Sequence, residues 1–385
     1  MAGPADAELR AWLALLLAPG LGPRRVAKLL NAFGGPQAAC DASTQALAAA
    51  GLSETMIAAL RAPDAATLEA ALAWAEHEDA TVLTRTDPRY PSRLAEVPTA
   101  PPVLFVRGDP RLLQEPQLAV VGSRNPTPGG LQTTKAFASH LAGLGLVITS
   151  GMASGIDSAA HQGALETGRT IAVLGTGPDR VYPAANRELA RRIAVEGVLV
   201  SEFPPGTGPQ PSHFPRRNLT ISGLSLGTLV TEAAPRSGSL ITARYAAEQG
   251  REVFAVPGSI HNPLARGCHA LIREGAKLID SVDQLLEELA PQLQDFLAPP
   301  AAQAVPAGKT FDPSNPQPPL AMATPGLDAD YRRLLEGMGH DPVALDELVE
   351  RTGFSAQEVS SMLLLLELQG HVSCLPGGRF ARRGD

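Results

Sequence analysis

The chain has 385 residues and a net charge of -7, from 32 lysines and arginines against 39 aspartates and glutamates. This length predicts two to three domains. The net negative charge excludes a histone-like protein that coats DNA and a polybasic membrane-binding protein, but it does not exclude a local basic site. Three scattered cysteines, Cys40, Cys268 and Cys374, fit neither a disulfide scaffold nor a metal site. We therefore expect a cytoplasmic protein without cofactor or metal. We also expect no membrane span, because the apolar run 13–18 is too short to cross a bilayer.

Residues 1–80 are rich in alanine and leucine at a helical period and predict an N-terminal helical domain. The segment 13–33 predicts two helices joined at residues 19–22, with Pro23 opening the second helix. Three basic residues follow on that helix: Arg24, Arg25 and Lys28. Such a helix-hairpin-helix could contact a phosphate through backbone amides, and a purely structural helical module explains the same residues equally well.

Residues 81–290 begin with a strand predicted at 103–107 and then alternate short apolar runs with helical patterns. Six further strands are predicted at 118–121, 147–149, 170–174, 198–201, 227–231 and 252–256. They carry little charge, as is typical of parallel strands covered on both faces. Helices are predicted between them, for example at 131–144, 157–167, 187–195 and 240–249. The alternation predicts an α/β fold with an extended Rossmann-like, doubly wound parallel sheet, whose ligands bind at the carboxyl ends of the strands.

Residues 291–326 contain nine prolines and predict a linker. Residues 327–385 predict a winged helix with helices at 328–338, 345–352 and 356–368, the last capped by Ser355, and a hairpin at Gly377-Gly378. The third helix begins Ser-Ala-Gln-Glu, and acidic residues outnumber basic ones in this domain. These features favour a protein-interaction or regulatory module over a DNA reader. DNA binding stays open because arginines lie in the wing at positions 379, 382 and 383.

Glycine, serine and arginine gather where the predicted strands end. The predicted strand at 118–121 is followed by Gly122-Ser123-Arg124, and the turn after the strand at 227–231 contains Ser237-Gly238-Ser239. Amides left uncovered at helix N-termini bind anions, and arginine adds bidentate phosphate contacts. The arginines placed to do so are Arg124, Arg216, Arg217, Arg236 and Arg244. Tight strand-to-helix turns need the same small residues, but the whole set favours phosphate binding.

The predicted phosphate ligand is a single-stranded nucleic acid backbone. The first turn reads G-S-R-N-P-T-P-G, which is not a dinucleotide fingerprint, and the chain contains no P-loop motif. Arginines on several strand ends suit several phosphates along a groove. The alternative is a nucleotide-binding enzyme or sensor, for example a nucleoside-phosphate hydrolase that depends on Glu232. Asp157 and His161 could form an acid–base or metal pair, but a helix-capping aspartate and a packed histidine are the favoured interpretation.

The central region resembles the DNA-processing protein A (DprA/Smf) family. The shared motifs, in order, are VVGSR (120–124), SGMASGID (150–157), AVLGTG (172–177), SEFPPGT (201–207), FPRRN (214–218), SGSLITA (237–243) and VPG (256–258). The resemblance implies a single-stranded DNA-binding, homodimeric Rossmann-like domain and no enzymatic activity. It implies a role in natural transformation, in which the protein protects incoming strands and loads a RecA-type recombinase. It also implies an N-terminal domain like a sterile-alpha-motif or helix-hairpin-helix fold.

The DNA contacts that the resemblance implies lie at Gly122, Ser123, Arg124, Gly151, Met152, Ala153, Phe214, Arg217, Asn218, Ser237, Gly238 and Ser239. Phe214 is the expected base-stacking ring. The chain departs from the family pattern at Leu219, Ser154 and His269, where the family usually has arginine, a basic residue and asparagine. Arg216 lies one place before Arg217, the arginine that the FP-x-RN motif shares with the family, and is a candidate to compensate for Leu219. We expect these departures to affect DNA affinity rather than the fold.

Overall fold

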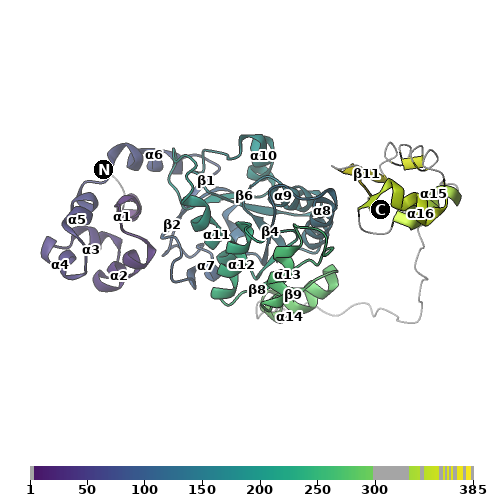
Figure 1. The fold of residues 1–385 in the computed structure, drawn as a ribbon. Helices are drawn as coiled ribbons and strands as arrows, with labels where there is room; N and C mark the ends of the chain where they lie inside the picture. The colour runs from purple at the N-terminus through teal and green to yellow at the C-terminus, as the bar shows by residue number, and fades with distance from the viewer. Residues whose placement is uncertain are drawn as a thin grey trace, which may run out of the picture. The chain divides into compact units, whose positions relative to one another are not determined.

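The computed structural model describes residues 4–297, 329–338, 342–354, 371–375 and 379–382, together with residues 359, 362, 363 and 366 (Figure 1). The chain forms two compact units, residues 1–296 and 297–385. The first unit contains the helical domain and the sheet, and the second contains the C-terminal domain.

The first unit begins with six helices, which confirms the predicted N-terminal helical domain. They are α1 (Pro4–Leu17), α2 (Pro23–Phe33), α3 (Pro36–Asp41), α4 (Thr44–Ala49), α5 (Glu54–Arg61) and α6 (Ala65–Ala75). Ser43, Ser53 and Asp64 cap α4, α5 and α6 by accepting a hydrogen bond from a first-turn amide. In the α1–α2 hairpin, the Arg25 guanidinium donates to the Gly20 carbonyl at 2.7 Å. The second helix begins at Pro23, where the sequence predicts it.

A nine-stranded sheet follows the helices. Its strands are β1 (Ala80–Thr84), β2 (Val103–Gly108), β3 (Gln117–Val121), β4 (Val147–Ser150), β5 (Thr170–Leu174), β6 (Val198–Ser201), β7 (Gly227–Val230), β8 (Glu252–Ala255) and β9 (Lys277–Leu278). The spatial order is β1-β2-β6-β5-β4-β3-β7-β8-β9, with β3 to β9 parallel and the β1–β2 and β2–β6 pairings antiparallel. Strand order therefore reverses between β3 and β7, which is where such sheets place their ligands.

Helices cover both faces of the sheet. They are α7 (Ser92–Ala95), α8 (Pro128–Gly143), α9 (Ile156–Thr167), α10 (Arg187–Glu196), α11 (His213–Leu224), α12 (Ser239–Glu248), α13 (Arg266–Arg273) and α14 (Val282–Leu297), with short 3-10 turns η1 (Pro110–Gln114) and η2 (Ala184–Asn186). Alternate residues of β3 enter opposite cores. Leu118 and Val120 pack with α8, α9 and α14, whereas Ala119 and Val121 pack with α7, α11, α12 and α13. The doubly wound fold predicted from the sequence is confirmed.

The helical domain and the sheet share one apolar core. Val103 and Phe105 of β2 pack among the apolar side chains of α1 to α6. The rings of Trp74 and Phe105 meet edge to face, with centroids 5.6 Å apart. The other side of β2, at Leu104 and Val106, belongs to the core beneath α7 and α11. The expected domain boundary at residue 80 therefore coincides with a change of secondary structure and not with a break in packing.

The predicted linker begins later than residue 291. Helix α14 continues through Pro291 to Leu297. A proline inside a helix removes one backbone hydrogen bond, but Leu289 and Leu293, on either side of Pro291, still pack on the sheet core. Residues 298–326 of the predicted linker lie outside the described residues.

The second unit has the strand and helix pattern of a winged helix. It contains α15 (Ala329–Met338), β10 (Val343–Ala344), α16 (Leu345–Thr352), β11 (Val372–Leu375) and β12 (Arg379–Arg382), with strand order β10-β12-β11. Gly353 ends α16 in the left-handed conformation, at a φ of 73°. The predicted Ser355 cap, the Gly377-Gly378 turn, Arg383 and most of the predicted helix 356–368 lie outside the described residues.

Candidate nucleic-acid interface

Phe214, in the first turn of α11, lies at the centre of a cluster at the carboxyl ends of β3, β4 and β5. The guanidinium carbons of Arg124 and Arg217 lie 5.7 and 5.9 Å from the centroid of its ring. The Tyr182 ring lies 5.8 Å away, tilted by 43°. A Cβ on Gly175 would lie 3.0 Å from Phe214, a tight contact, so glycine here lets the backbone after β5 approach the ring closely. The structure thus brings together residues from three predicted strand ends.

Arg124 and Arg217 have very different surroundings. Arg124 is exposed, and no carboxylate of the described residues forms an ion pair with it. Arg217 is only 5% exposed, and its Nη1 donates to the carbonyl oxygens of Gly151 and, at 3.3 Å, Val173. A side chain at position 151 would collide with this guanidinium. Arg217 therefore holds the loop after β4, whereas Arg124 offers its charge to solvent.

The loop after β4 is fixed from within. Asp157, at the start of α9, accepts a hydrogen bond from the Ala153 amide at 3.2 Å. Burial raises the pKa of Asp157, and the positive charge of Arg217 opposes that rise. Met152 is fully buried at a φ of 61°, and its carbonyl accepts a hydrogen bond from Asn186 at 2.8 Å. Among the predicted contacts in this loop, Met152 can therefore offer its backbone but not its side chain.

His161 has a defined tautomer in the core behind this loop. The Thr170 hydroxyl donates to the Ile148 carbonyl at 2.5 Å, so it accepts from His161 Nδ1 at 2.7 Å. The Nε2 atom is then an unprotonated acceptor, buried without a direct partner. Burial, together with the charge of Arg217, lowers the pKa of His161 to about 3. The interpretation of His161 as a packed residue agrees with these contacts. The interpretation of Asp157 as a helix cap is wrong, because Gly155 is the N-cap of α9 and the Asp157 carboxylate accepts from the Ala153 amide of the preceding loop instead.

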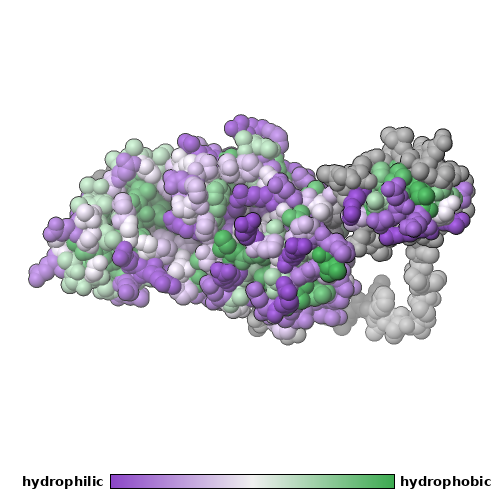
Figure 2. Space-filling view, in the orientation of Figure 1, coloured by the Kyte–Doolittle hydropathy of each residue, from purple (hydrophilic) through white to green (hydrophobic). Residues whose placement is uncertain are grey.

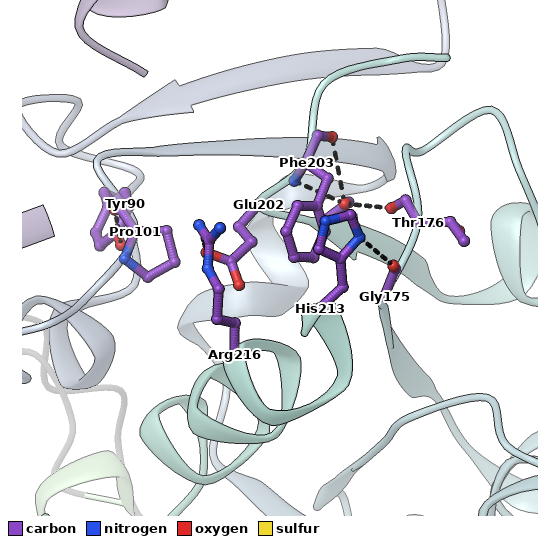
Figure 3. A network of polar contacts seen from close by, with 9 residues as sticks. Tyr90, Pro101, Gly175, Thr176, Glu202, Phe203, His213 and Arg216 are labelled. Atoms are coloured by element: carbon purple, nitrogen blue, oxygen red, sulfur yellow. Dashed lines mark hydrogen bonds and ion pairs between the residues drawn. The ribbon is translucent and has the colours of Figure 1, made fainter. Parts of the chain in front are cut away.

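Figure 3 shows the Arg216 side chain beside Glu202, close to Phe203 and His213. Its guanidinium pairs with Glu202 at 2.7 Å and lies 4.9 Å from the centroid of the Phe203 ring. The Phe203 ring stacks on His213, with centroids 4.0 Å apart. Burial raises the pKa of Glu202, and the ion pair with Arg216 opposes that rise. Arg216 is half exposed but is already neutralised by an internal partner.

The remaining predicted residues surround the start of α12. Asn218 donates to the Gly238 carbonyl at 3.3 Å, and the hydroxyls of Ser237 and Ser239 lie 2.7 Å apart. Asn218 thus joins α11 to this turn. Arg236 and Arg244 are exposed, and no carboxylate of the described residues pairs with either. Among the described residues, no hydrogen bond, ion pair or cation–π contact joins Arg244 to the cluster around Phe214.

Glu232 fills the position that a nucleotide phosphate would need. Its carboxylate accepts from the Thr127 amide at 2.8 Å and the Thr127 hydroxyl at 2.6 Å, at the N-terminus of α8. The Ser123 amide of the first turn donates to the Glu232 carbonyl at 2.7 Å, and Gly122 lies against the same carbonyl. A dinucleotide fold holds its pyrophosphate at this helix terminus. An internal carboxylate there weighs against the alternative of a nucleotide site.

Two of the three departures from the family pattern lie at the protein surface. Ser154 is exposed in the loop after β4, and His269 is partly exposed on α13, with its Nε2 3.0 Å from the Gly258 carbonyl oxygen. Leu219 is partly buried and packs on the core beneath α11. The leucine therefore has a packing role at a position where the family usually has arginine.

On the face of the first unit that Figure 2 shows, hydrophilic and apolar areas alternate. Within the described ranges, no group of three histidine, cysteine, aspartate or glutamate side chains is placed to hold a metal ion. The helices described here include none with the length and apolar character needed to cross a bilayer.

Fold and site together define an extended Rossmann-like protein with a helical N-terminal domain and a C-terminal winged helix. Residues 81–290 match the family model for DNA recombination-mediator protein A. Residues 6–73 match the SMF/DprA SAM domain, and residues 318–378 match the DprA winged helix domain. The chain belongs to the DprA/Smf family.

Known relatives agree with this assignment. The chain is 42% identical to Protein Smf of Escherichia coli over 313 residues, which cover 81% of this chain and 80% of the relative. It is 49% identical to DNA processing protein DprA of Streptococcus pneumoniae over 203 residues, covering 52% and 72% of the two chains.

Two solved structures are also similar. The X-ray structure of DprA from Streptococcus pneumoniae matches with a TM-score of 0.65 and 38% identity, covering 72% of this chain and 97% of that one. DNA processing protein A from Helicobacter pylori, whose structure is described in terms of its single-stranded DNA binding mode, matches with a TM-score of 0.51 and 29% identity. That match covers 56% and 98% of the two chains.

Proposed function

We propose that this chain binds single-stranded DNA at the carboxyl ends of β3, β4 and β5 and acts as a recombination mediator. The observation that carries the proposal is the exposed Arg124 guanidinium beside Phe214, which forms no ion pair with a carboxylate of the described residues. A free cation next to an aromatic ring suits a strand that presents phosphates on one side and bases on the other. The related Helicobacter pylori protein, with its single-stranded DNA binding mode, supports the same ligand class.

The predicted contact residues have different roles in this proposal. Arg124 binds a phosphate directly, and the backbone of Gly151 to Ala153 lies along the bound DNA strand. Arg217 positions that loop instead of contacting DNA, because its guanidinium is buried on the Gly151 and Val173 carbonyls. Exposed Arg236 and Arg244 are available to phosphates further along. Arg216 contributes less than Arg124, because Glu202 already neutralises it.

Family membership supports the wider role. The chain protects incoming single strands in the cytoplasm during natural transformation, transfers them to a RecA-type recombinase and works as a homodimer through its Rossmann-like domain. In this proposal it is not an enzyme, since catalysis is not needed to hold and transfer a strand. The winged helix serves protein contacts or regulation, as its acidic composition suggests.

The proposal is tested by fluorescence anisotropy of the full chain with labelled single-stranded and double-stranded oligonucleotides over a range of salt concentrations. We expect tighter binding to the single strand, with an affinity that falls as salt rises by a log–log slope of about -0.7 for each phosphate contact. Equal binding to both forms, or no binding at low salt, would contradict it. Strand exchange by a RecA-type recombinase on strands coated with single-strand-binding protein tests the mediator role and should be faster with the chain present.

A further inference from the structure

Among the aromatic residues whose exposure the structure describes, Tyr182 is the most accessible, with 48% of its surface exposed. It lies in the loop between β5 and η2, beside the cluster around Phe214. An exposed ring near an arginine without an ion-pair partner offers a stacking surface and a phosphate contact close together.

Phe214 has little free ring surface for a base. The backbone at Gly175 approaches it closely, and the guanidinium groups of Arg124 and Arg217 lie within 6 Å of its centroid. Tyr182 contacts it from a further direction. Phe214 is therefore partly covered by its own neighbours, whereas Tyr182 keeps about half of its surface open.

The loop that carries Tyr182 is held in place by hydrogen bonds at both ends. The Thr176 hydroxyl donates to the Arg180 carbonyl at 2.6 Å, and the Gly177 amide donates to the Thr207 carbonyl at 2.9 Å. On the other side, Asn186 donates to the Met152 carbonyl at 2.8 Å. A ring on a fixed loop with two side-chain torsions loses little conformational entropy on binding.

We propose that Tyr182 is a base-stacking residue of the single-stranded DNA site. A nucleobase stacks on its exposed face while the neighbouring phosphate binds Arg124, and Phe214 supports both groups from beneath. Because every base has a π-face, this contact adds affinity with little sequence preference. The inference rests on the proposed function, since it takes the ligand to be single-stranded DNA.

The test measures anisotropy of the full chain with two labelled ligands of equal length, an oligothymidylate and an abasic strand that keeps the phosphates but lacks the bases. Tyr182→Ala should weaken binding to oligothymidylate about tenfold, within the range known for one stacked base. Tyr182→Phe, which keeps the ring, should stay within about twofold of wild type. On the abasic strand, Tyr182→Ala and wild type should bind equally.

Two controls separate this inference from the proposed function. Arg124→Ala should weaken binding to both ligands, because it removes a phosphate contact. Val195→Ala, which changes an 86% exposed side chain on α10, should change neither. The stacking role is overturned if Tyr182→Ala leaves oligothymidylate binding unchanged, or if it weakens binding to the abasic strand as much. Failure of the wild-type chain to bind either ligand would overturn the proposed function itself.

Discussion

Arg216 and Arg217 are neighbours in sequence, but their guanidinium groups have different partners. Successive side chains of an α-helix are about 100° apart, so one points to Glu202 and the other enters the core behind Gly151. The sequence could predict that arginines gather at this turn. It could not predict which one is buried, because that depends on the space left at Gly151, more than sixty residues earlier in the chain.

Replacing Arg217 should affect the stability of the fold before it affects ligand binding. Arg217→Ala leaves the buried Gly151 and Val173 carbonyls without this donor and removes a positive charge that favours ionised Asp157, and we expect a loss of about 1–3 kcal/mol in the free energy of unfolding. Chemical denaturation of the full chain measures it. Arg216→Ala is the control and should cost clearly less, because Arg216 is half exposed. Equal losses for the two variants would contradict the positioning role of Arg217.

His161 makes the stability of the first unit depend on pH. Its pKa is about 3 in the folded chain and 6.5 as the ordinary value, so below pH 6.5 the unfolded chain binds a proton that the folded chain does not. Stability is therefore retained above pH 6.5 and falls by about 1.4 kcal/mol per pH unit as the pH drops from 6.5 towards 3. His161→Gln should show a shallower slope in this range when unfolding is measured by denaturant titration. An identical slope in both proteins would contradict the buried neutral histidine.

At the scale of elements, helices α8 and α9 pack unusually closely because a glycine lies at their contact. A Cβ on Gly163 would lie 2.5 Å from the Lys135 carbonyl oxygen of α8, whereas one on Gly143 would lie 3.5 Å from Thr167, an ordinary contact. Gly163→Ala should therefore push the helices apart and cost about 1–3 kcal/mol. Gly143→Ala should be neutral or stabilising by up to about 1 kcal/mol, since alanine favours helix. Thermal unfolding of both variants tests the contact, and similar midpoints would refute it.

Most strands of the large sheet were predictable from the sequence, but one central helix was not. Buried parallel strands have short apolar runs with little charge, and β5 and β6 have the predicted bounds. Helix α11 was not predicted as a helix. Arg217, Asn218 and all residues from 220 to 224 are buried, so it has no polar stripe and no apolar period. Since α11 carries Phe214, the sequence could name the residues of the cluster but not bring them together. The sequence analysis did not predict strand β1. This strand lies at the edge of the sheet and pairs only with β2, a pairing that is visible only in the fold.

At the scale of the whole molecule, the helical domain and the sheet should unfold together within the first unit. Trp74, 8% exposed, joins the two by packing on Phe105. Trp74→Ala should cost about 3–5 kcal/mol and reduce the hydrogen-exchange protection of β2 as well as of α6. Trp74→Phe, which keeps a ring at the contact, should cost less. Loss of protection confined to α6, with β2 unchanged, would show that the helical domain is independent.

The central claim is that an unpaired arginine at the carboxyl edge of the sheet binds a DNA phosphate. The most direct test compares the salt dependence of single-stranded DNA binding by the full chain, Arg124→Ala and Arg191→Ala. Arg191 is an exposed arginine on α10 that already pairs with Glu188. We expect Arg124→Ala to weaken binding about tenfold and to reduce the slope of log affinity against log salt by about 0.7, the value for one phosphate contact. Arg191→Ala should match wild type. Identical slopes and affinities for Arg124→Ala and wild type would contradict the claim.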